Sequence, residues 1–159
     1  DPLDGSYNFM RGIPLCAVSI ALCQGMTPLA GAVYDFVRDE LVHTNETAGL
    51  YRNGERIDRA ALGGPSSLST GIPAATRSNA EAAAKNAESL NAWGKVRMIG
   101  SAALSLSWVA QGKLDGYKET GIRWRDVAGG LALVRASGGN FTVANDDIWS
   151  PLEVSANGR

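Results

Sequence analysis

Residues 124–139, WRDVAGGLALVRASGG, decide most of the fold that the sequence predicts. They predict a helix that begins at Arg125 or Asp126 and ends at the Gly138-Gly139 pair, because glycine commonly closes a helix. Asp126 then lies in the first helical turn, where the helix dipole stabilises an acidic side chain. The internal Gly129-Gly130 pair lacks the spacing and the strand–turn–helix setting of a dinucleotide-binding fingerprint, so we exclude that function.

Strands and helices alternate around this helix, from residue 66 to the end of the sequence. The helix that follows the first strand has Ser78 as its N-cap, Glu81 as the capping-box partner and Gly94 as its stop signal. The expected elements are a strand at 66–72, a helix at 78–94, a strand at 95–100, a helix at 101–112, a strand at 114–119 and a hairpin that begins at 140–145.

The first part of the chain has a different pattern, that of an antiparallel meander with a typical hairpin turn at Asn53-Gly54. Strands are expected at 13–23, 28–35, 40–43 and 49–51. Layers of sheet and helix, in an α/β or α+β arrangement, would bury the apolar faces of both parts. We therefore expect a single domain, with an antiparallel part at 1–65 and an alternating α/β part at 66–159.

Composition excludes several classes of protein. The 159 residues carry a formal net charge of −1, so nothing in the charge balance predicts binding to nucleic acid. The longest apolar run, at 13–23, is too short to span a bilayer. Cys16 and Cys23 read as core residues rather than a disulfide framework or a zinc site, which indicates a reducing compartment and a cytoplasmic protein.

The segment DPLDGSYNF, residues 1–9, gathers acidic and small residues. Asp1 and Asp4 flank a proline that holds the Leu3 carbonyl in a defined direction, and such hard oxygen ligands suit Mg²⁺, Mn²⁺ or Ca²⁺. Gly5 lets an anion approach the backbone, and Ser6 can act as the N-cap of a short helical turn whose free N–H groups attract phosphate. An ordinary Asp-Gly turn explains the same residues, so spacing alone leaves both interpretations open.

Two other segments carry polar groups that could belong to a site, and both also have a structural explanation. Glu119 and Asp126 lie seven residues apart, but Asp126 is equally explained as a helix N-terminal acid. Residues 100–102 form a strand-to-helix turn with outward N–H groups, although its serine is also an ordinary N-cap. The only histidine, His43, is interpreted as a half-exposed strand residue, not as a catalytic base.

Taken together, these segments resemble the inositol monophosphatase family. DPLDGSYNF resembles the family signature DP-[IL]-D-G-[ST]-x-N-F, and WRDVAGGLALVRASGG resembles its second signature, an aspartate followed by a V-A-x-G helix that ends in a glycine pair. The segments GAVYDFVRDELVHTNETAGLYRNGERI, STGIP, RMIGSAALSLSWVAQGKLDGYKE and VSANGR follow the family in order and spacing. The resemblance covers essentially the whole chain and implies the layered α-β-α-β-α sandwich of the inositol monophosphatase and fructose-1,6-bisphosphatase type, in partial form.

This resemblance implies a Mg²⁺-dependent phosphomonoesterase that acts on inositol monophosphate or a related sugar phosphate through a metal-activated water. It also implies lithium sensitivity and a homodimer, with no nucleic acid or membrane as partner. Two or three Mg²⁺ ions, or Mn²⁺, would be held by Asp1, the Leu3 carbonyl, Asp4 and Asp126, and the hydroxyl of Ser6 would orient the water. The implied substrate-binding residues are Gly5, Ser6, Gly100, Ser101, Ala102 and Glu119.

The sequence departs from the family pattern in three places. The N-terminal portion, with a Gly-Glu motif that supplies a further carboxylate, is absent, and so is the closing segment after VSANGR; we therefore expect a part of a longer enzyme that is inactive alone. Arg125 stands where many members have Trp, and Arg123 is nearby, which fits either a second phosphate or simple solvent exposure. The alternatives are a fructose-1,6-bisphosphatase-type or nucleotide 3′-phosphatase activity, and a catalytically incomplete module that binds metal and phosphate.

Overall fold

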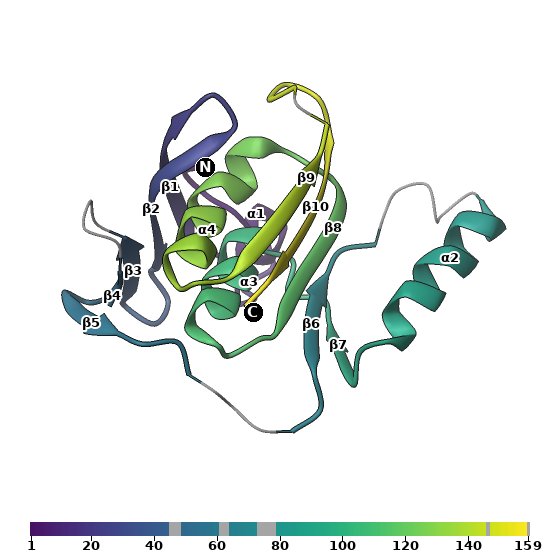
Figure 1. Cartoon of the computed structure of the whole chain (residues 1–159), viewed down its shortest axis with the longest axis horizontal. Helices are drawn as coiled ribbons and strands as arrows, with labels where there is room; N and C mark the ends of the chain where they lie inside the picture. The colour runs from purple at the N-terminus through teal and green to yellow at the C-terminus, as the bar shows by residue number, and fades with distance from the viewer. Residues whose placement is uncertain (45–48, 61–63, 73–78, 146, 159) are drawn as a thin grey trace.

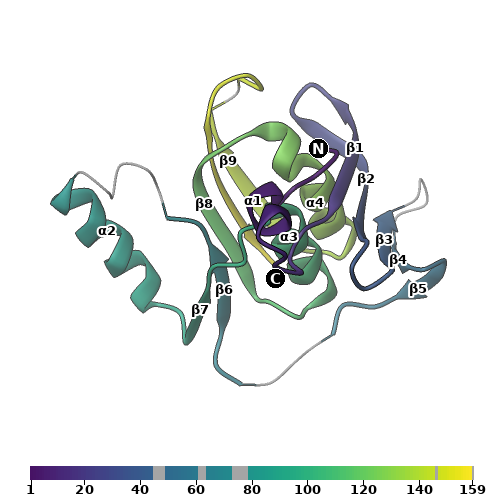
Figure 2. The same cartoon turned by 180° about the vertical axis from the view of Figure 1, so that it is seen from behind.

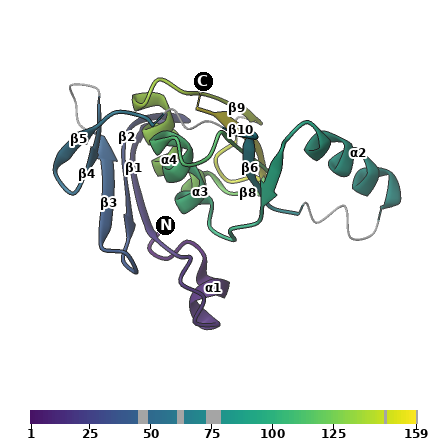
Figure 3. The ribbon, with the colours of Figure 1, turned by 90° about the horizontal axis from the view of Figure 1, so that it is seen from below.

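The structure, a computed structural model, describes residues 1–44, 49–60, 64–72, 79–145 and 147–158. Two five-stranded sheets lie on either side of a helix pair, α3 (Ala102–Gln111) and α4 (Trp124–Ala136). Figure 3 shows this order of layers, with the helix pair between the two groups of strands. The mixed α+β layered class expected from the sequence is confirmed.

The first sheet is an antiparallel meander, as predicted. Its strands follow one another in sequence order, namely β1 (Val18–Gln24), β2 (Thr27–Asp35), β3 (Glu40–Thr44), β4 (Leu50–Arg52) and β5 (Glu55–Ile57). Asn53 and Gly54 both adopt positive φ angles, of 50° and 85°, which is what a tight hairpin between β4 and β5 requires. His43 lies half-buried on β3 and stacks on Tyr51, as a strand residue would.

The second sheet is mixed and comes entirely from the later part of the chain. Its strand order is β7-β6-β8-β10-β9, in which β6 is parallel to β7 and β8, while β10 is antiparallel to β8 and β9 (Figure 1). The bounds are β6 (Ser67–Thr70), β7 (Lys95–Arg97), β8 (Gly116–Ile122), β9 (Asn140–Ala144) and β10 (Leu152–Asn157).

The glycine pair inside α4 serves packing. A Cβ added to Gly130 would lie 2.4 Å from the Cβ of Leu106 on α3, and one added to Gly129 would lie 2.5 Å from the Oγ of Ser19 on β1. Both residues therefore let α4 approach its neighbours more closely than any side chain would allow. The apolar side chains of α3 and α4, such as Leu106 and Leu131, are fully buried in the core that they share with both sheets.

The other two helices lie outside this core. α1 (Ser6–Met10) follows the first loop, and α2 (Ala80–Asn91) connects β6 to β7. Figure 2 shows α2 projecting away from the second sheet, and none of its residues is buried. Its N-cap is Asn79, whose side chain accepts hydrogen bonds from the N–H groups of Glu81 and Ala82; the predicted cap, Ser78, lies outside the described residues.

Several boundaries differ from the prediction. The strand expected at 13–23 begins only at Val18, because Pro14 has no N–H to donate and Ala17 pairs with Asp4 in an isolated bridge. Strand β8 continues to Ile122, three residues beyond its expected end at Glu119. None of the helices in the described part of the chain has the length and apolar content that a bilayer crossing requires.

Candidate active site

Asp4 is the most deeply buried acid of the first loop. Its backbone N–H and carbonyl each form a hydrogen bond with Ala17, at 2.9 and 3.0 Å, which places the loop against the start of β1. The residue is only 8% exposed. Its carboxylate accepts hydrogen bonds through Oδ2 from the Ser101 hydroxyl and from the N–H of Ala103 at 2.8 Å. Ser101 is also the N-cap of α3, as predicted, since its Oγ accepts from the N–H of Leu104 at 3.2 Å.

Glu119 enters the site from β8 together with a residue that the sequence analysis missed. The buried Tyr117 hydroxyl donates to Glu119 Oε2 at 2.8 Å, because residues two apart on a strand point to the same face. Gly71 leaves room for this carboxylate, since an added Cβ there would collide with Glu119 Oε1. The period-two spacing of Tyr117 and Glu119 in GYKE was the signal that could have identified the tyrosine.

Burial, and then the charge of neighbouring acids, raise the pKa of two carboxyl groups of the site. Burial raises the pKa of the Asp4 carboxyl group, and the charges of Asp126 and Glu119 add to the shift, while its hydrogen bonds oppose it. Burial also raises the pKa of Glu119, opposed by the hydrogen bond from Tyr117 and reinforced by the charge of Asp126. Burial and the neighbouring Glu119 raise the pKa of the Tyr117 phenol well above its usual value. Asp4 and Glu119 are therefore close enough to Asp126 for its negative charge to act on both.

Asp1 is held in place by the backbone of β1. Its N–H group donates to the Ser19 carbonyl at 2.7 Å, and the Ser19 N–H donates back at 2.9 Å, as in a strand pair. Its side-chain Oδ1 accepts from the N–H of Leu3 at 3.0 Å, which leaves Oδ2 without a hydrogen bond from the described residues. The proline between the two acids thus belongs to a defined turn.

The prediction that Ser6 is the N-cap of the short helix after the first loop is wrong. Gly5 is the N-cap, with φ +80°, and its carbonyl accepts the first helical hydrogen bond from Phe9; Ser6 is the first helical residue and caps nothing. Only glycine fits this position, because a Cβ would lie 2.6 Å from the Leu15 carbonyl oxygen. The exposed Ser6 hydroxyl forms no cap, so it is free to face solvent at the mouth of the loop.

Asn8, another residue without a predicted role, joins this loop to the turn before α3. Its Nδ2 donates to the carbonyls of Leu15 at 2.8 Å and of Ile99 at 2.9 Å. Gly100, with φ +74°, makes the close approach possible, because a Cβ there would lie 2.9 Å from Asn8 Nδ2. The N-F dipeptide in DPLDGSYNF gave no signal of this contact, which joins residues 91 positions apart.

Asp126 lies in the first turn of α4, as predicted. Its Oδ2 accepts from the backbone N–H of Arg123 at 3.3 Å, and its Oδ1 lies 3.4 Å from the Nε of Arg125. Its side chain is 17% exposed, so it is less enclosed than Asp4. The backbone N–H at the helix N-terminus and the Arg125 side chain together hold this carboxylate.

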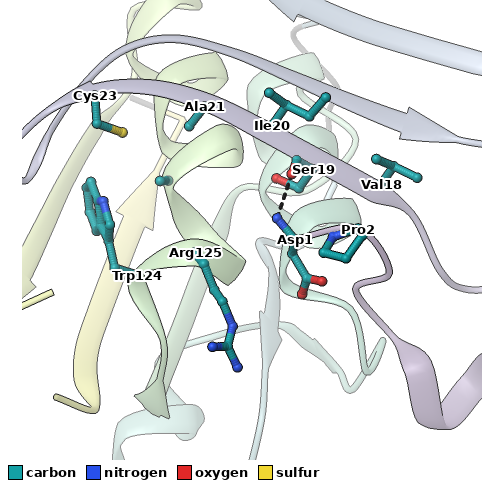
Figure 4. A pocket seen from close by; sticks show the side chains of 10 residues that line it. Asp1, Pro2, Val18, Ser19, Ile20, Ala21, Cys23, Trp124 and Arg125 are labelled. Atoms are coloured by element: carbon teal, nitrogen blue, oxygen red, sulfur yellow. Dashed lines mark hydrogen bonds between the residues drawn. The ribbon is translucent and has the colours of Figure 1, made fainter. Parts of the chain in front are cut away.

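Some of the predicted residues line two cavities. A cavity of about 560 Å³ is lined by Asp4, the α3 turn formed by Gly100, Ser101 and Ala102, and Glu119, among others. Asp1 lines a second cavity of about 460 Å³, with β1 on one side and Trp124 and Arg125 of α4 on another (Figure 4). The structure therefore brings the predicted substrate-binding turn, Glu119 and one predicted metal ligand into one space, and places Asp1 on a second cavity. The other predicted residues, Leu3, Gly5, Ser6 and Asp126, line neither of these two cavities.

Sequence comparison agrees with this arrangement. The profile of the inositol monophosphatase family matches residues 1–157. The chain belongs to the inositol monophosphatase family. It is 41% identical over 143 residues to the Nus factor SuhB of Xylella fastidiosa, which covers 87% of this chain and 52% of the relative. It is 37% identical over 156 residues to the fructose-1,6-bisphosphatase/inositol-1-monophosphatase of Thermococcus kodakarensis, with 97% and 56% covered.

Solved structures support the same family. The inositol monophosphatase from Anabaena (Nostoc) matches with a TM-score of 0.85 and 33% identity, over 99% of this chain and 67% of that one. The chain spans only about half the length of the two curated relatives, at 52% and 56%. The inositol monophosphatase fold described above is therefore shared with proteins that are longer than this chain.

The acidic residues of this family member suit a divalent cation. Carboxylate and carbonyl oxygens are the ligands that Mg²⁺ prefers, and Asp1 Oδ2 and Asp4 Oδ1 accept no hydrogen bond from the described residues. The raised pKa of Asp4 comes first from burial and then from the charges of Asp126 and Glu119, and a bound cation would offset that negative charge. No three Asp, Glu, His or Cys side chains of the described residues form a ready-made metal cluster.

Proposed function

We propose that the protein containing this chain is a Mg²⁺-dependent phosphomonoesterase that acts on a small phosphorylated polyol or sugar, such as inositol monophosphate. The observation that carries the proposal is that Asp4 and Glu119 line one cavity together with the N-terminal turn of α3, close enough to Asp126 to feel its charge. Family membership supports the same activity, as does the name of the Thermococcus kodakarensis relative.

In this proposal Asp1, the Leu3 carbonyl, Asp4 and Asp126 hold Mg²⁺. With Mg²⁺ held there, a bound water would have a lowered pKa and the charge on the phosphoryl oxygens would be neutralised. Ser101 and Ala103 hold the Asp4 carboxylate in one orientation, so that its second oxygen faces away from α3. Asp126 is held in turn by the Arg123 N–H.

The remaining residues bind and orient the substrate. The backbone N–H groups of Gly5 and Ser6 hold the phosphate, and the exposed Ser6 hydroxyl orients the attacking water. Glu119, kept in place by Tyr117, accepts hydrogen bonds from hydroxyl groups of the polyol. The turn at 100–102 lines the same cavity as Glu119. Lithium inhibition and a homodimer stay predictions from the resemblance.

A binding role without turnover is the second candidate. The relative that is 41% identical is named a Nus factor rather than an enzyme, and the described residues hold no ready-made metal cluster. A module of this kind would keep affinity for metal and phosphate but would release no phosphate.

One assay of the full-length protein separates the two candidates. Phosphate release is measured with and without Mg²⁺ from inositol 1-phosphate, fructose 1,6-bisphosphate and adenosine 3′,5′-bisphosphate. We expect Mg²⁺-dependent release from at least one of them, and a loss of about a hundredfold or more in Asp126→Asn, because several kcal/mol of transition-state stabilisation depend on the metal. The exposed Asp58→Asn is the matched control and should retain full activity.

Two results would contradict the proposal. Absence of release from all three compounds, with Mg²⁺ binding retained, would favour the binding role. Full activity in Asp126→Asn would show that the site has been placed wrongly, since the asparagine keeps the shape of the residue and removes only its charge.

A further inference from the structure

Two arginines stand at the start of α4, where the helix dipole is positive. Arg123 is the N-cap and Arg125 is the second helical residue, and between them Trp124 is buried. Cations at a helix N-terminus are unfavourable, because the free N–H groups already carry partial positive charge. Asp126 offsets part of this charge, since its carboxylate lies 3.4 Å from the Arg125 Nε and accepts from the Arg123 backbone N–H, but one carboxylate does not balance two guanidinium groups.

The two guanidinium groups line a small cavity. It has a volume of about 220 Å³ and is lined by Arg123, Trp124, Arg125, Ile148 and Trp149. Arg123 is anchored there, because its Nη1 donates to the Trp149 carbonyl at 2.6 Å. The indole of Trp149 is 80% exposed, so the cavity has an apolar wall that is open to solvent.

Arg125 keeps most of its donors available. The only ion pair of its side chain with a described residue joins Nε to Asp126 Oδ1 at 3.4 Å. The side chain is 74% exposed. Its two terminal nitrogens donate no hydrogen bond to the described part of the chain. A guanidinium with free terminal N–H groups is well suited to bind two oxygens of one phosphate.

Arg125 connects this small cavity to the candidate site. It also lines the cavity of Asp1, and Figure 4 shows its side chain and the Asp1 carboxylate pointing to the same side of that cavity. Ile122, which directly precedes Arg123, lines the cavity of Asp4 and Glu119. A ligand at Asp1 therefore has the Arg125 guanidinium beside it, and Arg123 lines the small cavity that shares Trp124 and Arg125 with the cavity of Asp1.

We propose that Arg123 and Arg125 form a subsite for a second anionic group of the substrate, so that the preferred substrate is a bisphosphate or a phosphomonoester with another acidic group. This inference rests on the proposed phosphatase function. An anion in the subsite would be bound by the guanidinium groups and stabilised by the α4 dipole, which removes the electrostatic conflict of this helix start.

The test compares two substrates that differ in one phosphate, fructose 1-phosphate and fructose 1,6-bisphosphate, in the full-length protein with Mg²⁺. The measured quantity is the kcat/KM for release of the 1-phosphate from fructose 1,6-bisphosphate, divided by the kcat/KM for fructose 1-phosphate. We expect this ratio to fall about tenfold in Arg125→Gln or Arg123→Gln, mainly through KM of the bisphosphate, because one charge-assisted hydrogen bond is lost. Arg125→Lys should restore part of the ratio.

The control is Arg52→Gln on β4, an exposed arginine whose loss changes the net charge equally and which should leave the ratio unchanged. If both fructose phosphates are hydrolysed and the ratio is the same in all variants, the subsite is refuted while the phosphatase function stands. If Arg125→Gln lowers both activities equally, Arg125 acts by positioning Asp126, and the subsite is again refuted. If the unmodified protein hydrolyses neither compound nor inositol 1-phosphate, the proposed function itself fails and this inference with it.

Discussion

The candidate site has an inner wall, formed by Asp4, Ser101, Tyr117 and Glu119, and an outer rim, formed by Arg123, Arg125 and Trp149. Hydrogen bonds join the inner-wall residues in two pairs, Asp4 with Ser101 and Tyr117 with Glu119, and burial raises the pKa of both carboxyl groups. The outer rim comes from one helix start and one adjoining segment, and its side chains are mostly exposed.

This difference separates two kinds of role. Inner-wall groups are buried, so removal of one partner leaves the other unsatisfied and affects both stability and the charge of the site. Outer-rim groups contribute little to the folded state, since exposed ion pairs and side chains add little to stability. The inner wall therefore suits the step common to all substrates, and the rim suits discrimination between them.

The largest effect on stability is expected at the inner wall, in Tyr117→Phe. The substitution leaves the Glu119 carboxylate buried without its donor and should lower the free energy of unfolding by about 1–3 kcal/mol. Urea denaturation of both proteins measures the change. Tyr34→Phe is the matched control, because its hydroxyl also donates to a carboxylate, Asp39, at 2.8 Å but on an exposed surface. Equal losses of unfolding free energy in the two variants would show that the buried hydrogen bond of the inner wall contributes no more to stability than the one on the surface.

A smaller effect with a defined pH dependence is expected for Asp4→Asn in the absence of divalent cations. Burial raises the pKa of Asp4 in the folded protein, so the stability that its neutral form contributes is complete below the unfolded pKa and is lost as pH rises through the folded value. Asparagine does not ionise and keeps the acceptor for Ser101. The melting temperature of Asp4→Asn should therefore rise relative to that of the unmodified protein between pH 4 and about pH 7.

The same experiment has a control in the metal. Addition of Mg²⁺ at neutral pH should stabilise the unmodified protein more than Asp4→Asn, because the cation offsets the charge that the variant lacks. A melting-temperature difference that is independent of both pH and Mg²⁺ would mean that Asp4 carries no electrostatic cost in this site.

The smallest effect is expected at the outer rim, in Trp149→Ala. Trp149 is 80% exposed, and its contact with Arg123 uses the backbone carbonyl. The free energy of unfolding should therefore change by no more than about 0.5 kcal/mol. The melting temperature measures this change. A loss of stability as large as that of Tyr117→Phe would show that the rim is part of the folded core, and that the inner wall and the outer rim do not differ in their contribution to stability.

Local patterns in the sequence predicted much of the fold and part of the site. The meander of the first sheet, the N-cap at Ser101 and the position of Asp126 in the first turn of α4 follow from strand, capping and glycine signals within a few residues. Ser6 was misjudged as a cap, because Gly5 takes the cap position in a left-handed conformation that depends on the nearby Leu15 carbonyl. Tyr117 was missed although its period-two spacing from Glu119 indicated a shared face, whereas the contact of Asn8 with Ile99, 91 positions away, has no local signal.

The sequence by itself determined the family, the order of the elements and the chemical types of the site residues, because these depend on motifs and on periodicity along the chain. Only the tertiary structure decided which of those residues meet. The Ser101 hydroxyl reaches Asp4 across 97 positions of sequence, and Asn8 reaches Ile99 across 91. Such contacts depend on how the layers pack, and Gly129 and Gly130 permit the close approach of α4 to β1 and to α3.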